Sequence, residues 1–343
     1  MTKLPLLTNG LLLVSFITTG ALADEVKSIS MDGPTTDRWM YPFNATPGYR
    51  PGASTFGIWT GQGDLFDNLD AQFVVGFDTS EDLQPGTAED WQVTSATVTF
   101  QLSNSGIPYD DTVDVWNTFV EPTDVDWIDD VDPGQPIELF GTGFRYDYTA
   151  TTWPEDAPFG FGNPAALDVR SAYAGGFRDG ELVDVSNHVR DRWTPTPFAV
   201  GIVPGLADGD PVPQDSVFTF SIDVGDPNIA AYIMDGLDSG VLSFTLASMT
   251  IVDGHTGNFP FPVFYCRENA AVKFGIASGA TLDLTLEPAP AGDPCDLNGD
   301  GTVDGADLSI LLGSWNTSDA DADLDGNGVV DGADLATLLG CWG

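Results

Sequence analysis

The sequence predicts a mainly β protein: a jelly-roll-like β-sandwich followed by a small α-helical module at the C-terminus. Over residues 24–287, short stretches rich in Val, Phe, Thr and Ile alternate with Pro, Gly, Asn and Asp, and no long helical period interrupts them. Over residues 295–343, an acidic stretch and an apolar stripe each occur twice. Many short strands without helices between them favour a sandwich or a jelly roll.

The strand prediction rests on alternating or short apolar runs. Six segments show this pattern clearly: 71–77, 96–102, 198–202, 217–224, 241–251 and 281–286. Residues 288–294, with the sequence Pro-Ala-Pro-Ala-Gly-Asp-Pro, have the composition of a linker. We therefore expect one sandwich domain over 24–287, a linker over 288–294 and a separate module over 295–343.

The first 23 residues have the features of a secretory signal peptide. Lys3 precedes an apolar stretch over residues 11–17, and Ala21-Leu22-Ala23 matches a small-residue cleavage site. No later run approaches the roughly 20 apolar residues that span a bilayer. The prediction is a protein that is secreted and then extracellular or at the cell surface, without a membrane span.

The charge balance limits the partners. The chain has 11 Lys and Arg against 52 Asp and Glu, a net charge of −41. Nucleic acids and anionic membrane surfaces are poor partners for such a field. We expect neither as a ligand.

The C-terminal region repeats one acidic loop, from Asp296 to Asp307 and again from Asp323 to Asp334. Each copy has oxygen-bearing side chains at positions one, three, five, nine and twelve and glycine at position six, which is the ligand spacing of a calcium loop. Position seven supplies a backbone carbonyl. The candidate ligands are Asp296, Asn298, Asp300, Thr302, Asp304 and Asp307, and Asp323, Asp325, Asn327, Val329, Asp331 and Asp334.

An apolar stripe with the spacing of one helix face follows each loop. Its members are Leu308, Leu311, Leu312 and Trp315, and Leu335, Leu338, Leu339 and Trp342. A helix of about two turns is too short to be stable alone. We expect the two Leu and Trp faces to pack together and folding to be coupled to the binding of two calcium ions. Polar linkers are the alternative interpretation, but two full matches in register favour calcium loops.

The three cysteines fall into a pair and a single residue. Cys295 and Cys341 bracket the repeated loops, and a two-fold arrangement brings the ends of this region together. An oxidising compartment permits a disulfide between them. Cys266 is then unpaired, and we expect a buried, inert thiol.

The repeated loop and helix resemble the type I dockerin module, in which aspartate also closes each loop. The resemblance covers residues 295–343 and implies docking onto a cohesin-like or cell-surface protein, often in polysaccharide degradation. Residues 316–322 are too few for the customary middle helix. Each repeat also departs from the family at two residue pairs. Gly-Ala stands at 305–306 and at 332–333, where the family has small hydroxyl residues. Leu-Gly stands at 312–313 and at 339–340, where the family has Lys-Arg.

Short stretches of the sandwich region are similar to the DNRLRE or carbohydrate-binding-like group of exported modules. They lie at 77–80, 94–100, 182–189 and 264–269. This resemblance implies one elongated jelly roll with long insertions.

Candidates for catalysis are few. Asp184, Ser186 and His188 are close in sequence, but this does not give triad geometry, and a structural role is expected. His255 is expected in a turn. Carboxylates for glycoside hydrolysis would come from Glu121, Asp124, Asp129, Asp130 and Asp132, but in a chain this acidic we expect solvated surface for them. Aromatic residues that can stack on sugar rings or serve as core anchors are Trp39, Tyr41, Trp59, Trp127 and Trp153.

Three interpretations stay open at this point. The favoured one is a non-catalytic, secreted calcium-binding protein with an attachment module and a carbohydrate-binding sandwich, acting in extracellular polysaccharide-related assembly. The second is a polysaccharide-degrading enzyme, either an O-glycosyl hydrolase or a polysaccharide lyase. The third is a structural surface protein whose calcium module only stabilises its terminus.

Overall fold

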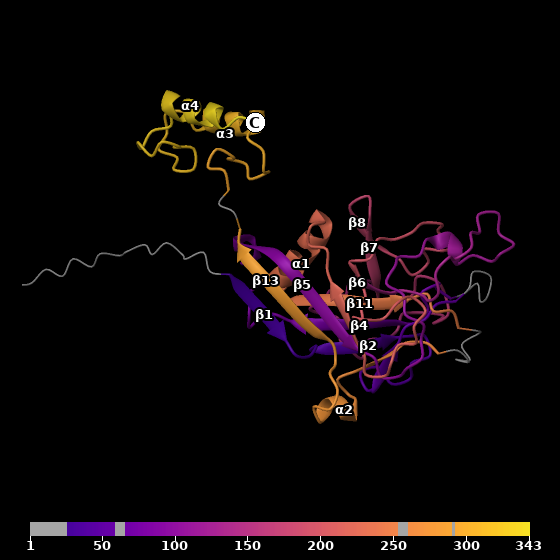
Figure 1. Cartoon of the computed structure of the whole chain (residues 1–343). Coiled ribbons are helices and arrows are strands. Elements are labelled where there is room, and N and C mark those ends of the chain that lie inside the picture. Colours follow the sequence, from indigo (N-terminus) through magenta and orange to yellow (C-terminus); the bar gives the residue numbers. More distant parts are fainter. Residues whose placement is uncertain (1–25, 59–65, 253–259, 290–291) are drawn as a thin grey trace, which may run out of the picture. The chain divides into compact units, whose positions relative to one another are not determined.

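The computed structural model describes residues 26–58, 66–252, 260–289 and 292–343 (Figure 1). Its contacts divide the chain into two compact units, residues 1–288 and 289–343, which we call the body and the terminal unit. The boundary coincides with the start of the predicted linker. The predicted signal peptide, Trp59 and His255 lie outside the described residues.

The body is mainly β and antiparallel. Its strands in the described part of the chain are β1 (Lys27–Met31), β2 (Thr36–Met40), β3 (Gly52–Ser54), β4 (Gln72–Asp78), β5 (Trp91–Gln101), β6 (Ile137–Phe144), β7 (Ala172–Arg178), β8 (Glu181–Asp184), β9 (Ala199–Val200), β10 (Val217–Ser221), β11 (Val241–Ser248), β12 (Val263–Tyr265) and β13 (Thr281–Pro288). The helical elements are η1 (Ala88–Asp90), η2 (Trp116–Thr118), α1 (Pro227–Ser239) and α2 (Ala270–Lys273), followed in the terminal unit by α3 (Gly305–Gly313) and α4 (Gly332–Gly340). Strands coincide with all six predicted segments.

Two main sheets form the described part of the body. The four-stranded sheet has the order β1-β13-β5-β10, and the seven-stranded sheet has the order β2-β4-β11-β6-β7-β8 with β9 also paired to β6. The short strands β3 and β12 form a third, two-stranded sheet. The chain crosses repeatedly between the two main sheets, so neighbouring strands such as β1 and β13 come from distant parts of the sequence (Figure 1).

The main core lies between the two sheets. In β13, Leu282, Leu284 and Leu286 are buried, whereas Asp283 and Glu287 are exposed. This alternation is typical of a sheet that buries one face. The leucines join one apolar cluster with inward-facing side chains of the other sheet, such as Phe73 of β4. The mainly β prediction is confirmed, and the arrangement is consistent with a β-sandwich.

The seven-stranded sheet is buried on its outer face as well. Two long segments, 102–136 and 145–171, supply the cover. Phe119 packs in a second apolar cluster with Phe140 of β6, and Trp153 packs in a third with Val74 of β4. Because both faces are covered, the strands of this sheet have long apolar runs in place of strict alternation.

Helix α1 corrects the expectation that no helix interrupts the sandwich region. It has a full set of start and stop signals: Asp226 caps the N-terminus, Pro227 occupies the first turn, and Gly240 ends it with a φ of 85°. Ile229, Ile233 and Leu237 bury its inner face. The spacing i, i+4, i+8 was present in the sequence, but the interior Gly236 weakens the helical pattern.

Candidate functional site

The terminal unit consists of two loops, each leading into a short helix. Asp304 and Asp331 are the N-cap residues of α3 and α4, and they accept hydrogen bonds from the N–H groups of Ala306 and Ala333 at 2.7 and 2.8 Å. Position twelve of each loop is the third residue of its helix and completes a capping box. The helices therefore begin where the loops must end, which fixes the last candidate ligand on a rigid element.

The first residue of each loop organises the backbone that follows it. The Asp296 carboxylate accepts hydrogen bonds from the N–H groups of Gly299, Asp300 and Gly301 at 2.9, 3.2 and 2.7 Å. Gly301 has a φ of 87°, a conformation that costs little only for glycine. The loop consequently curls around the position-one carboxylate, as a calcium loop requires.

The second loop repeats this geometry. The Asp323 carboxylate accepts hydrogen bonds from the N–H groups of Asn327 and Gly328 at 3.1 and 2.7 Å. Gly328 has a φ of 92°. The carboxylates of Asp323, Asp325 and Asp334 come within 4.8 Å of one another. Three predicted ligands of this loop are therefore close enough to share one cation.

Positions three, five and seven are linked by short-range hydrogen bonds. Asp300 accepts hydrogen bonds from the N–H and hydroxyl of Thr302 at 2.9 and 2.7 Å, and Asn298 accepts one from the N–H of Asp300 at 2.9 Å. In the second loop, Asn327 accepts a hydrogen bond from the N–H of Val329 at 3.0 Å. These bonds hold successive side-chain oxygens on the curled part of the loop.

The position-twelve aspartates are buried and closely bound. Asp307 accepts hydrogen bonds from the N–H groups of Asn298 and Asp304 at 3.1 and 2.8 Å, and Asp334 accepts the equivalent bonds from Asp325 and Asp331 at 3.0 and 2.7 Å. These backbone donors hold the pKa of both carboxyls below the usual range. Both side chains are thus kept as carboxylates, the form that ligates a metal.

The donor set fits calcium. Every predicted ligand atom is an oxygen, and each carboxylate retains lone pairs beyond its backbone hydrogen bonds. Residues 289–343 contain eleven aspartates and no Lys, Arg or His. Because no basic side chain of this unit can neutralise the loops, a hard divalent cation is the natural counter-charge.

A small core and a disulfide join the two helices. Val303, Leu311, Val330 and Leu338 are buried together with Cys295. Cys295 and Cys341 form a disulfide with a Cα–Cα distance of 6.3 Å. The expectation that the two Leu and Trp faces pack together is met by only part of each stripe, with Leu311 and Leu338 in the shared core. Leu308 and Leu335 are half-buried, and the other four members are exposed, namely Leu312, Trp315, Leu339 and Trp342.

No catalytic triad forms at Ser186 and His188. His188 is buried, and its Nδ1 lies 3.1 Å from the carbonyl oxygen of Val185. Burial lowers its pKa to about 4. The Ser186 hydroxyl accepts a hydrogen bond from Gln72 at 2.8 Å, and Asp184 forms an ion pair with Arg145 at 2.6 Å. The three side chains have separate structural partners. Cys266 is buried, as expected.

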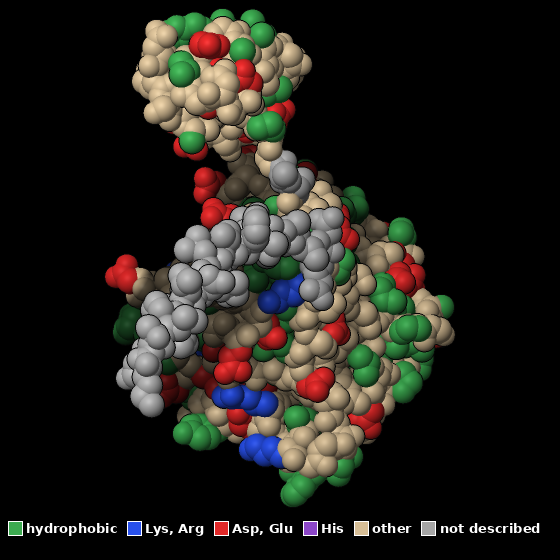
Figure 2. All heavy atoms as spheres, turned by 90° about the vertical axis from the view of Figure 1, so that its left-hand side faces the viewer, with side chains coloured by type: hydrophobic (Ala, Val, Ile, Leu, Met, Phe, Trp, Pro, Cys, Tyr) green, Lys and Arg blue, Asp and Glu red, His purple; other side chains and the backbone are tan. Residues whose placement is uncertain are grey.

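The acidic candidates in the body separate into two groups. Glu121 and Asp129 are exposed, and Asp124 forms an ion pair with Arg192 at 2.9 Å. Asp130 and Asp132 are half-buried, which corrects the expectation of solvated surface for these two. Other acidic side chains are scattered over the face of the body seen in Figure 2, among few Lys and Arg.

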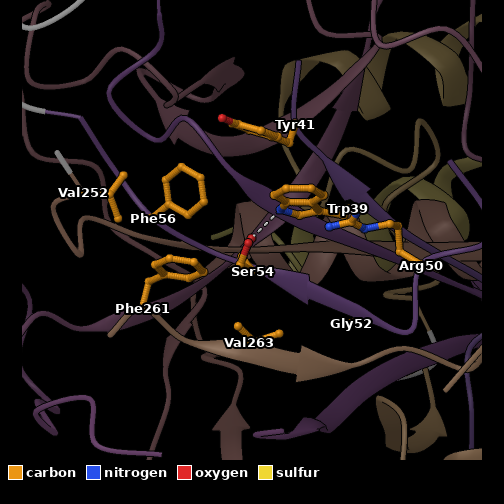
Figure 3. A pocket seen from close by; sticks show the side chains of 9 residues that line it. All are labelled: Trp39, Tyr41, Arg50, Gly52, Ser54, Phe56, Val252, Phe261 and Val263. Atoms are coloured by element: carbon orange, nitrogen blue, oxygen red, sulfur yellow. Dashed lines mark hydrogen bonds between the residues drawn. The ribbon is translucent and has the colours of Figure 1, made fainter. Parts of the chain in front are cut away.

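The aromatic candidates are mostly core residues, but two of them line a pocket. Trp153 is buried and Trp127 is half-buried against the second apolar cluster. Trp39 and Tyr41 stack with ring centroids 4.5 Å apart at one side of a cavity of about 210 Å³ (Figure 3). The cavity is lined by Trp39, Tyr41, Arg50, Gly52, Ser54, Phe56, Val252, Phe261 and Val263.

This pocket combines flat apolar rings with one positive charge. The Arg50 guanidinium lies 4.6 Å from the Trp39 ring centroid, and the rings of Phe56 and Phe261 pack against each other with centroids 5.2 Å apart (Figure 3). Trp39 donates a hydrogen bond to the Ser54 carbonyl at 2.8 Å. Sequence reasoning missed Arg50, Phe56 and Phe261, because nothing local marks them as neighbours of Trp39.

Comparison of the chain with protein-family models, with curated proteins and with solved structures finds no match. In the described part of the chain, no helix is both long and apolar enough to cross a membrane.

Proposed function

We propose that this is a secreted calcium-binding protein whose terminal unit is a dockerin-like attachment module. One observation carries the proposal: two 12-residue loops share the same hydrogen-bonded curl, the same buried position-twelve aspartate and the same capped helix. Two calcium ions would be held by the ligand sets predicted from the sequence. The partners would be a cohesin-like or cell-surface protein, in polysaccharide-related assembly outside the cell.

The calcium part is tested by titration calorimetry on the full chain. Asp296→Ala combined with Asp323→Ala removes a position-one carboxylate from each loop and should lower the calcium stoichiometry by two per chain. Asp321→Ala is the matched control, because Asp321 is exposed and lies outside both loops. Unchanged stoichiometry in the double variant would refute the loop assignment.

For the body we propose a jelly roll that binds carbohydrate at the pocket of Figure 3. Eight strands can be renumbered 1 to 8 in chain order: β1, β4, β5, β6, β7, β10, β11 and β13. In these numbers the four-stranded sheet has the order 1-8-3-6. The seven-stranded sheet contains the order 2-7-4-5, with β2 on one side of it and β8 on the other. This alternation supports two linked Greek keys. The described pocket lining contains no carboxylate, which favours sugar binding over glycoside hydrolysis at this place.

A polysaccharide array separates these alternatives. Retention of the chain without released reducing ends supports binding, and released ends support an enzyme. Retention should fall in Arg50→Ala, since the guanidinium is the only charged group of the described lining. Absence of both signals would leave the structural-protein interpretation.

A further inference from the structure

A second carboxylate cluster lies in the body, where residues 110–114 meet residues 130–138. Asp110, Asp114 and Asp132 have carboxylate oxygens within 4.8 Å of one another. Asp110 and Asp132 are 22 positions apart in the chain, so no loop motif connects them. Glu138 of β6 is buried nearby, on the sheet face that the long segments cover.

The backbone fixes this meeting point. Gly134 has a φ of 120°, and a Cβ at this position would lie 2.7 Å from the Tyr109 carbonyl oxygen and 2.8 Å from Cβ of Asp110. No other residue allows so close an approach. Tyr109 is held in turn, because its carbonyl accepts a hydrogen bond from Gly209 at 2.8 Å and its N–H donates to Asp210 at 2.9 Å. Asp110 therefore sits at a rigid junction of three segments.

Several buried oxygens at this junction have no hydrogen-bond partner. Asp110 is only 2% exposed; its Oδ1 accepts hydrogen bonds from Thr112, and its Oδ2 accepts none. Oδ2 of Asp114, Oδ1 of Asp132 and Oε1 of Gln135 are also buried and without a partner. Orphaned oxygens of this kind are rare in folded proteins and call for an explanation such as an ion.

The cluster also has no positive neighbour among the described residues. The charged neighbours of Asp114 are Asp130, Asp110 and Asp132. The charged neighbours of Glu138 are Asp114 and Asp110. Among the described residues, every charged neighbour of these two groups is negative.

The second acidic cluster of the body differs in having a basic side chain among its carboxylates. Asp37, Glu155 and Glu268 also converge, but Arg267 reaches all three. Its main-chain N–H donates to Asp37 at 2.7 Å, and its guanidinium pairs with Glu155. In the part of the chain that the structure describes, the cluster at Asp110 has no such arginine.

We propose that Asp110, Asp114 and Asp132 bind one calcium ion in the body, with the Gln135 amide oxygen as a further candidate ligand. The ion would take the place that Arg267 has in the other cluster and would tie the covering segments to the seven-stranded sheet. Calcium fits best because all donors are oxygens, no His or Cys is among them, and its coordination of six to eight ligands tolerates an irregular set completed by water. The site does not depend on the terminal unit.

The test uses the full chain with both terminal loops disabled by Asp296→Ala and Asp323→Ala. This background should still bind one calcium ion by titration calorimetry. At calcium a hundredfold above Kd, the thermal midpoint of the body should rise by roughly 5 °C or more. If the terminal loops turn out not to bind calcium, the residual site in the body is unaffected. The two proposals are therefore tested separately.

Asp114→Asn and Asp132→Asn, made in the same background, should weaken the residual Kd at least tenfold and remove the calcium-dependent rise. Without calcium, both variants should be as stable as their parent or more so, because each relieves repulsion; this result also excludes a folding defect. Asp129→Asn, an exposed neighbour, is the control and should change neither value. No residual calcium binding, unchanged binding in both variants, or an equal rise with magnesium at the same concentration would overturn the proposal.

Discussion

The body and the terminal unit are stabilised by different means. The body has a continuous core between two sheets, and its outer sheet face carries two further apolar clusters. Among the described residues of the terminal unit, the core holds six buried apolar residues, one of which is a disulfide cysteine. A unit of about 55 residues rarely folds on so small a core without disulfides or metals. Both units contain clustered aspartates, but the stability of the terminal unit depends on their neutralisation far more than the stability of the body does.

Removal of calcium should separate the two units most strongly. We expect a chelator to unfold residues 289–343 while the body keeps its β structure, because uncompensated carboxylates then outweigh the small core. Limited proteolysis of the full chain with and without chelator measures this directly. The expected product is a resistant fragment that ends near residue 288.

A terminal unit that stays protease-resistant under chelator would contradict the idea that metal binding and folding are coupled. Readdition of calcium is the control and should restore resistance. The Asp296→Ala and Asp323→Ala double variant should be cleaved in the terminal unit with or without calcium.

Arg170→Met should destabilise the body alone. The Arg170 side chain is buried, pairs with Asp67 at 2.8 Å, and donates to the carbonyls of Leu69 and Asp70 at 2.9 and 3.0 Å. Loss of one partner of a buried pair costs about 3–5 kcal/mol, because the remaining charge has no counter-ion. Denaturant unfolding measures the loss.

Arg192→Met is the matched control for this variant. Arg192 pairs with Asp124 and Asp126 near solvent, so its loss should cost about 1 kcal/mol or less. Equal effects of the two variants would show that burial of the pair does not decide its importance.

Cys341→Ser should act on the terminal unit. The disulfide closes a loop with a sequence separation of 46, for which the chain-entropy model gives about 4 kcal/mol at most. The thermal transition of the terminal unit in saturating calcium should fall, and the body transition should not. Cys266→Ala is the control, since Cys266 is a free buried cysteine of the body; a fall in the terminal transition of that variant would show that the units are not independent.

The two units also differ in how far sequence predicts them. The calcium loops are local, because alternate residues within twelve positions supply the ligands, and Asp307 and Asp334 lie where the pattern puts them. The cluster of Asp110, Asp114 and Asp132 depends on a contact through Gly134 that no periodicity records. Strand β6 was missed for a similar reason: Gly141 and Gly143 look like turn residues, but aromatic rings of Tyr232 and Tyr173 cover them.

The smallest expected effect is the dependence of the body's stability on pH that His188 causes. Its folded pKa of about 4 lies below the ordinary 6.5, because burial disfavours the charged ring. Between these values the unfolded chain binds a proton that the folded chain does not. The contribution of neutral His188 to the free energy of unfolding is therefore complete above pH 6.5. It is lost as the pH falls toward 4, and the loss amounts to about 3 kcal/mol. The measurement is the free energy of unfolding of the body at fixed calcium, from pH 7 to pH 4. His188→Gln should remove this dependence of stability on pH. An identical dependence in both proteins would show that another group causes the acid sensitivity.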